Sequence, residues 1–227
     1  MTEHPRLFAI SDLHLPGGDD KSMDLFGPHW LRHFDKVRED WLSRVGGSDI
    51  VLIPGDISWA MRLEDAVPDL LAIGALPGTK VMIKGNHDFW WSSLSRVRAA
   101  LPAKTHVIQN DALRLGGLVF CGSRGWTPPG DGDEGPENRR IYERELARLE
   151  MSLTAARKLS PDGRLVALCH FPPFGSRGED SPVSLLLERY RAHDVVYGHL
   201  HGVGCPAGFT GERNGVRYWF ASCDCVG

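Results

Sequence analysis

Five short apolar runs in this chain each end abruptly in a turn that carries Asp, Asn or His. In order they are LFAI before SDLH, VLI before PGDI, VMI before KGNHD, LVALC before HFPP, and DVVY before GHLHG. Runs of this length are typical of buried strands, and in open α/β sheets ligands bind beyond the carboxyl ends of the strands. If the five ends converge, they bring together seven polar side chains: Asp12, His14, Asp56, Asn86, His170, His199 and His201.

These seven side chains offer imidazole nitrogens and carboxylate or amide oxygens, and no thiolate. Such donors suit Mn, Fe, Zn or Ni and argue against a structural zinc held by cysteines. Seven ligands are too many for one tetrahedral zinc. They fit two divalent ions if one carboxylate bridges, and Asp56, between the first pair and the later group, is the natural bridge. We expect Mn, with Fe, Zn or Ni as alternatives.

The remaining pattern alternates strands with helices. Apolar runs predict strands at 6–10, 49–53, 80–83, 164–168, 194–196 and 216–222, and spacings of three and four predict helices at 30–45, 63–73, 92–101 and 137–158. Gly116-Gly117 and Asn214-Gly215 are turn signals that predict hairpins. Strand and helix alternate first and hairpins come later, so we expect a mixed sheet, or two packed sheets, covered by helices.

The composition describes an ordinary soluble protein. The chain has 227 residues, 42% of them hydrophobic, which is enough for a single α/β domain. A net charge of -3 and the lack of a basic stripe predict no stable nucleic-acid binding. No signal peptide or membrane span is readable, so we expect a cytoplasmic protein. Five cysteines at irregular spacing predict reduced thiols rather than a disulfide framework.

Five short motifs together resemble those of the calcineurin-like metallophosphoesterase superfamily: DLH, GD, GNHD, H before FPP, and GHLH. The match runs from residue 12 to residue 201, and its details are similar to a bacterial group of phosphohydrolases. The resemblance implies a four-layer αββα sandwich of two packed mixed β-sheets flanked by helices, in a single domain over 1–227. It also implies a dinuclear metal centre and the hydrolysis of a phosphoester.

Carried over by position, the resemblance divides the ligands between two ions. One ion would take Asp12, His14, Asp56 and His201, and the other would take Asp56, Asn86, His170 and His199. His87 would be the general acid for the leaving oxygen. The implied reaction is in-line attack of a metal-bridging hydroxide on the phosphorus of a small phosphodiester or phosphomonoester.

Three alternatives compete with this interpretation. A non-catalytic scaffold of the same fold predicts gaps in the ligand set, and none is missing here. The second alternative is a lipid-pyrophosphate hydrolase. The branch of the superfamily with that activity carries Arg where this chain has His87, so the sequence departs from it. A metal-dependent nuclease usually carries further DNA-binding regions, and this chain has no basic extension.

Several residues near the motifs have roles that the sequence leaves open. Arg124 is either a phosphate clamp or a partner in a structural salt bridge. Of Trp90 and Trp91, we expect one to pack in the core and the other to border the pocket, with Trp59 and Trp126 as further candidates for its wall. We expect Asp88 to form hydrogen bonds in its turn. We expect the Gly/Pro/acid-rich segment 127–138 to be an exposed loop in a position to gate the pocket. The metal identity, natural substrate, oligomeric state and role of the Cys223/Cys225 tail stay open.

Overall fold

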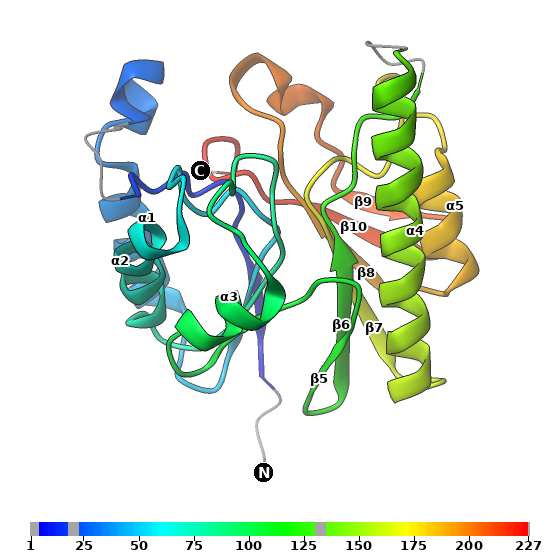
Figure 1. Ribbon diagram of the computed structural model, residues 1–227, viewed down its shortest axis with the longest axis horizontal. Coiled ribbons are helices and arrows are strands. Elements are labelled where there is room, and N and C mark those ends of the chain that lie inside the picture. The colour runs from blue at the N-terminus through cyan, green and yellow to red at the C-terminus, as the bar shows by residue number, and fades with distance from the viewer. Residues whose placement is uncertain (1–4, 18–22, 130–134, 227) are drawn as a thin grey trace.

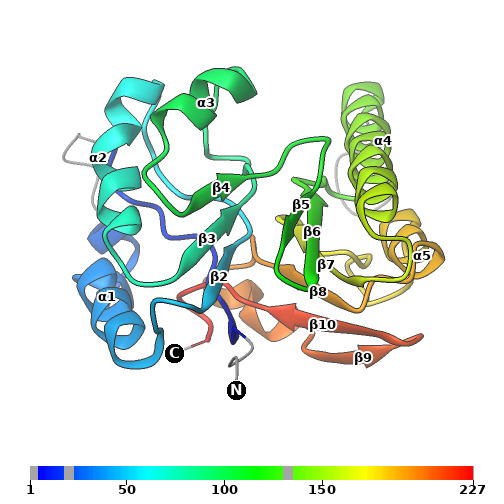
Figure 2. The same cartoon turned by 90° about the horizontal axis from the view of Figure 1, so that it is seen from below.

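Two β-sheets pack face to face, and helices cover the outer face of each (Figure 1). The computed structural model describes residues 5–17, 23–129 and 135–226. Helices α1, α2 and α3 lie on one side and helices α4 and α5 on the other, as both views show (Figure 2). Their bounds are His33–Arg44 for α1, Leu63–Gly74 for α2, Leu94–Ala100 for α3, Pro136–Leu159 for α4 and Pro182–Arg189 for α5.

The first sheet has four strands in the order β1-β2-β3-β4. The strands are β1 (Leu7–Ala9), β2 (Ile50–Ile53), β3 (Thr79–Met82) and β4 (Thr105–Val107). All three pairings are parallel, and the register of β2 on β3 places Leu52 beside Val81. Because parallel strands run the same way, their carboxyl ends meet at one edge of the sheet.

The second sheet has six strands in the order β5-β6-β7-β8-β10-β9. The strands are β5 (Leu113–Leu115), β6 (Leu118–Ser123), β7 (Arg164–Cys169), β8 (Asp194–Tyr197), β9 (Gly211–Arg213) and β10 (Val216–Phe220). The four inner strands are parallel, whereas β5 and β9 join as antiparallel edge strands through the two predicted hairpin turns. Short 3₁₀ helices complete the described elements: η1 (Met23–Phe26), η2 (Pro28–Trp30) and η3 (Gly202–Ala207).

Alternation along the strands builds the layers. In β2, Ile50 and Leu52 point into the core between the two sheets, while Val51 and Ile53 point toward the helices. Strand β7 alternates in the same way, with Val166 and Leu168 in the core between the sheets. Both sheets are therefore apolar on both faces, which is why their strands appear as unbroken apolar runs in the sequence.

The predicted fold class is confirmed, with differences in detail. Of the two sheets only the second is mixed; the first is parallel throughout. The sequence interpretation did not assign β4 or α5. None of the described helices is long and apolar enough to cross a membrane.

One prediction about the cysteines is wrong. Cys205 and Cys225 form a disulfide, which ties η3 to the C-terminal segment, while Cys121, Cys169 and Cys223 are free thiols. The pair is separated by 20 residues in sequence, and no local spacing rule indicates that the two cysteines meet. They meet because β10 returns the chain to the end of β8, from which η3 follows.

Candidate metal centre

All seven predicted ligands, and His87, follow the carboxyl ends of strands. The turns after β1, β2 and β3 in the first sheet supply Asp12, His14, Asp56, Asn86 and His87. The turns after β7 and β8 in the second sheet supply His170, His199 and His201. The centre therefore lies at the seam between the two sheets, and each sheet supplies part of it.

Three ligands form a first group at this seam. One donor atom each from Asp12, His14 and His201 lie within 4.8 Å of one another. The Nε2 atom of His201 lies 3.3 Å from the Nε2 atom of His14 and 3.3 Å from Oδ1 of Asp12. Imidazole and carboxylate atoms that face one another at this spacing can share one cation.

A second group forms around His170. Donor atoms of Asp12, Asp56 and His170 also lie within 4.8 Å of one another. The Nε2 atom of His170 lies 3.3 Å from Oδ2 of Asp56 and 2.6 Å from the amide oxygen of Asn86. The same oxygen of Asp56 lies 3.8 Å from Nε2 of His14, so Asp56 faces both groups.

His199 lies beside these groups rather than within either. Its ring centroid is 5.1 Å from that of His170, and its backbone N–H donates to the carboxylate of Asp12 at 3.0 Å. In this conformation the ring also packs against Phe171, with 3.9 Å between the centroids. Thus six of the seven predicted ligands point at one another, and the seventh is their neighbour.

The backbone at the centre is held in an unusual conformation. Asp12, His14, Asp56 and His199 have φ values of 62°, 44°, 52° and 74°. L residues rarely adopt this left-handed region, and each such residue costs on the order of 1 kcal/mol or more. Strain of this kind collected at four predicted ligands indicates that the turns are shaped for the site.

Two glycines let these turns come close together. A Cβ atom on Gly85 would collide with the backbone nitrogen and carboxylate of Asp56. One on Gly198 would collide with Ser11 and the carboxylate of Asp12. The two carboxylates therefore occupy the space that a side chain would take at either glycine.

The two carboxylates are buried without a permanent cation beside them. Asp12 and Asp56 are 0% and 1% exposed, and all their ion-pair partners among the described residues are histidines. Burial alone would raise the pKa of Asp12, but the hydrogen bond from His201 and the charge of His170 outweigh it and lower the pKa. Burial also opposes the ionised form of Asp56, but the charge of His170 outweighs it and lowers the pKa, so both acids are ionised at neutral pH.

The histidines divide into two kinds. Burial lowers the pKa of His14 to about 4, and burial together with the charge of His170 lowers that of His199 to about 4. Burial also opposes the charged form of His170 and His201, but neighbouring carboxylates raise their pKa values to about 9 and about 10. In this structure His170 and His201 supply the positive charge that balances the two acids.

This donor set fits divalent cations. His170 and His201 can bind a metal ion only as neutral imidazoles, so bound cations would replace the protons that balance the two carboxylates here. The carboxylates have no Lys or Arg partner among the described residues that could do this instead. The Nδ1 atom of His14 is also buried without a hydrogen-bond partner among the described residues. Oxygen and imidazole donors in this number suit Mn, Fe, Zn or Ni, and two groups of donors around a shared pair of carboxylates suit two ions.

His87 lies at the edge of the centre and belongs to neither group of ligands. Its backbone N–H donates to Oδ1 of Asp56 at 2.8 Å, which fixes the start of the turn. Its half-buried ring lies 4.5 Å from the ring of Trp59 and 5.6 Å from that of His14, between centroids. Trp59 in turn stacks on His14 at 4.8 Å. The imidazole is thus held beside the centre.

Asp88 holds the two turns of the first sheet together, as its predicted role in the turn requires. Its buried carboxylate accepts hydrogen bonds from four backbone N–H groups and from the indole of Trp90. Three of those backbone groups belong to the turn after β2 and one to Gly85. Burial and the nearby charge of Asp56 raise the pKa of Asp88 to about 6.

Two residues at the centre were missed in the sequence. Asp224 accepts a hydrogen bond from Nδ1 of His201 at 2.7 Å, so the other ring nitrogen of His201 faces Asp12. The ring of Trp30 lies 5.7 Å from that of His201 and walls the centre on that side. Asp224 lies between two cysteines in the C-terminal segment, where no spacing signal connects it with His201.

The structure also corrects the expected pocket wall. Trp90 and Trp91 are 1% and 5% exposed and both pack in the core between the first sheet and its helices, so neither borders the metal centre. Trp91 instead lines a separate cavity beside Arg124. Arg124 pairs with the buried Glu145 at 3.2 Å, and its guanidinium lies over the ring of Trp126. Of the two roles considered for Arg124, the salt bridge is the one the geometry supports. Residues 130–134 of the expected loop lie outside the described residues.

Comparison with known proteins places this site in a family. The model of the calcineurin-like phosphoesterase family matches residues 5–203. The comparison with curated proteins finds no match. Among solved structures, a phosphopantetheinyl hydrolase from Mycobacterium tuberculosis is similar with a TM-score of 0.58 at 16% identity, over 98% of this chain and 91% of that chain. A protein of unknown function from Aquifex aeolicus has a TM-score of 0.40 at 18% identity, over 82% and 94% of the two chains.

The family match extends over most of the chain and includes every strand-end turn that supplies the centre. The hydrolase from Mycobacterium tuberculosis shares the fold along nearly the whole length of both proteins. The chain belongs to the calcineurin-like phosphoesterase family.

Proposed function

We propose that this protein hydrolyses a small phosphoester, a phosphodiester in preference to a phosphomonoester, with two divalent metal ions. The observation that carries the proposal is the cluster of donors at the seam of the sheets. It consists of two groups that share Asp12: one adds His14 and His201, and the other adds Asp56 and His170. Family membership supports metal-dependent phosphoester hydrolysis in general. The preference for a small diester is our own inference.

We assign the ligands to two sites that share Asp56. One site is formed by Asp12, His14, Asp56 and His201, and the other by Asp56, Asn86, His170 and His199. The position of Asp56 between His14 and His170 supports the sharing. When bound, two such ions would neutralise phosphoryl oxygens and bring the pKa of water down to about 7. Mn is the metal we expect, and Fe, Zn and Ni are the alternatives, because oxygen and imidazole donors without thiolate suit all four.

His87 is the proposed general acid. It lies beside both ligand groups, is half-buried, and is oriented by Trp59 and by its own backbone bond to Asp56. From this position its imidazole would donate a proton to the leaving oxygen as the bond to phosphorus breaks. Trp59 would hold the ring in place and keep water from that side.

Charge argues for a small substrate rather than a nucleic acid. A duplex binds through several Lys or Arg side chains that neutralise successive phosphates. The chain carries a net charge of -3, and the centre is lined by carboxylates, imidazoles and aromatic rings. At 16% identity the hydrolase from Mycobacterium tuberculosis lends its fold and not its substrate, so a phosphopantetheinyl ester enters our test as one diester among several.

A substrate panel tests the proposal. Bis-p-nitrophenyl phosphate, p-nitrophenyl phosphate, cyclic nucleotides, a phosphopantetheinyl ester and plasmid DNA are assayed with Mn, Fe, Zn, Ni and Mg at two salt concentrations. We expect metal-dependent cleavage of the small esters, fastest for diesters, with little effect of salt. Fast plasmid cleavage that collapses as salt rises would favour the nuclease alternative. No cleavage with any metal would favour the scaffold.

A further inference from the structure

A cavity of about 560 Å³ lies directly beside the metal centre. Its walls come from four segments that are far apart in the sequence: 126–128 after β6, 171–178 after β7, the end of β8, and the stretch from η3 to β9. His199 lines this cavity and also contacts His170 of the centre. The cavity therefore begins where the reacting phosphoryl group would sit.

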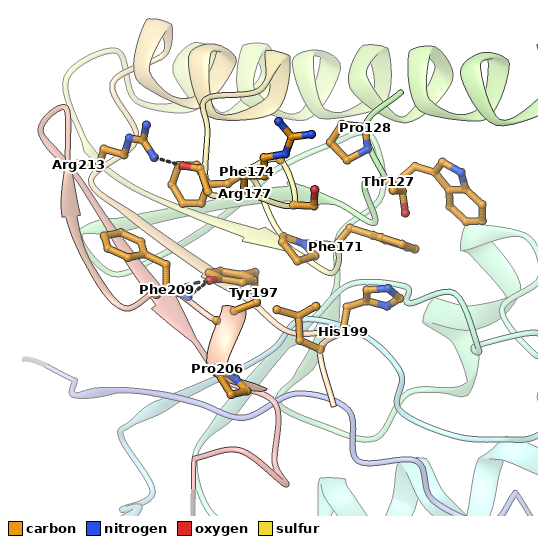
Figure 3. Close-up of a pocket in the computed structure, with 18 residues that line it drawn as sticks. Thr127, Pro128, Phe171, Phe174, Arg177, Tyr197, His199, Pro206, Phe209 and Arg213 are labelled. Atoms are coloured by element: carbon orange, nitrogen blue, oxygen red, sulfur yellow. Dashed lines mark hydrogen bonds between the residues drawn. The ribbon is translucent and has the colours of Figure 1, made fainter. Parts of the chain in front are cut away.

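Several aromatic rings face the cavity, from three of its four wall segments and from the strand end that forms the fourth. Phe171 lies against the ring of His199 at one end, and Phe174 and Phe209 approach each other with 5.7 Å between centroids (Figure 3). The hydroxyl of Tyr197, also in the wall, already exchanges hydrogen bonds with the backbone of Phe209 in both directions. The middle of the cavity thus offers apolar surface and few polar groups to a ligand.

Among the described residues that line the cavity, two are arginines, Arg177 and Arg213, and none is Lys, Asp or Glu. Arg213 pairs with Asp180 at 3.0 Å, and its guanidinium lies 5.0 Å from the ring centroid of Phe174. Arg177 is exposed, and its guanidinium has no ion-pair partner in the described part of the chain. Figure 3 shows Arg213 and His199 on opposite sides of the cavity, with Arg177 on the upper rim between them.

We propose that this cavity binds the organic group of the substrate, an apolar group that ends in a second anion held by Arg177. This inference rests on the proposed function and adds the substrate class. The volume of the cavity lies in the range of sites for small molecules, and its aromatic rings favour a flat or extended apolar group. The Arg177 guanidinium forms no ion pair in the described part of the chain, and the nearby carboxylate of Glu179 accepts from the backbone N–H of Arg177 instead. The guanidinium therefore favours a carboxylate or phosphate on the ligand.

The position of the cavity also explains the expected preference for diesters. A phosphodiester carries two organic groups on its phosphorus, and the centre has two different flanks. His87 and Trp59 lie on the side of His14, whereas the cavity lies on the side of His199. One substituent would leave past His87 while the other stays in the cavity.

Binding of phosphonates, which the enzyme cannot hydrolyse, tests the cavity without turnover. Three probes are titrated calorimetrically into the protein in excess Mn²⁺: methylphosphonate, and 3-arylpropylphosphonates whose ring ends in a carboxamide or a carboxylate. We expect the carboxamide probe to bind about tenfold more tightly than methylphosphonate, from burial of its ring. The carboxylate probe should gain about a further fivefold from Arg177.

Three variants locate these gains. Arg177→Gln should remove the preference for the carboxylate, and Ala207→Trp, which fills the cavity from η3, should remove the gain from the aryl group. Arg114→Gln on β5 is the matched control, because this exposed arginine lies at the opposite edge of the same sheet and should change neither. Equal affinity for all three probes, or preferences that survive both cavity variants, would overturn the inference.

The same preparation separates this inference from the proposed function. Hydrolysis of methyl p-nitrophenyl phosphate depends on the metal centre and not on Arg177, because its methyl group does not reach that arginine. Cleavage of this ester without any preference among the probes would reject the cavity and keep the function. The expected preferences without cleavage of any ester would keep the cavity as a binding site and reject the function.

Discussion

Three consecutive residues of the turn after β3 do three different things. Asn86 turns its amide oxygen toward His170 at 2.6 Å, within the centre. His87 projects beside Trp59 at the edge of the centre. Asp88 points inward and accepts backbone hydrogen bonds from the turn after β2. One short turn thus supplies a candidate ligand, a candidate acid and the anchor that holds both in place.

Replacing His87 tests its assignment as the acid. His87→Gln should keep metal content and thermal stability, because the ring is half-buried and its fixed contact is through the backbone. Turnover of alkyl esters should fall by about 10²–10⁴-fold, since a poor leaving group needs a proton. With p-nitrophenyl esters the loss should be much smaller. Equal losses across leaving groups, or lost metal, would show that His87 has a structural role.

Asp224 is expected to orient His201 for metal binding. Its carboxylate fixes Nδ1 of His201, and outer partners of this kind change metal affinity by about 10–100-fold. Asp224→Asn should therefore weaken binding of Mn²⁺ to metal-free protein by about tenfold in a chelator competition. Asp162→Asn, at an exposed aspartate outside the centre, is the control and should have no effect. Unchanged affinity in Asp224→Asn would remove Asp224 from the metal site.

At the scale of elements, the sequence was most informative where an apolar strand ends in a polar turn. Each of the five units appears in the structure with its polar residue at the strand's carboxyl end. Strand β4 was not assigned because two of its three residues, Thr105 and His106, are polar, so it forms no apolar run, unlike the equally short β1. Helix α5 had a signal that can be read in the sequence, a serine followed by a proline at 181–182, which is typical of a helix start. In the structure Ser181 is the N-cap and accepts hydrogen bonds from two backbone N–H groups.

The close approach of the turns after β2 and β3 gives a prediction at this scale. Gly85→Ala places a methyl group against Asp56, so the turns must separate. We expect unfolding to become easier by about 1–3 kcal/mol, together with weaker metal binding because Asp56 is displaced. Gly117→Ala in the β5–β6 hairpin, where a Cβ meets no atom within 4 Å, is the matched control. Calorimetry and metal titration of both variants measure the two effects.

At the scale of the whole molecule, the centre exists because two sheets meet. The order of the ligands along the chain indicated which strand ends carry them, and the family motifs indicated that they converge. Which residues meet across the seam depends on tertiary packing, which no local pattern encodes. The contacts of Asp224 with His201, of Trp30 with His201, and of Cys205 with Cys225 are all of this kind. The cavity beside His199, formed by four separate segments, is another.

The shared position of Asp56 is the feature on which the two-metal proposal depends. Metal-free protein is titrated with Mn²⁺ while bound metal and hydrolysis of bis-p-nitrophenyl phosphate are followed together, in wild type and in Asp56→Asn. We predict that binding saturates near two ions per chain, that full activity requires both, and that Asp56→Asn weakens both sites. Saturation at one ion, with Asp56→Asn fully active, would contradict the proposal.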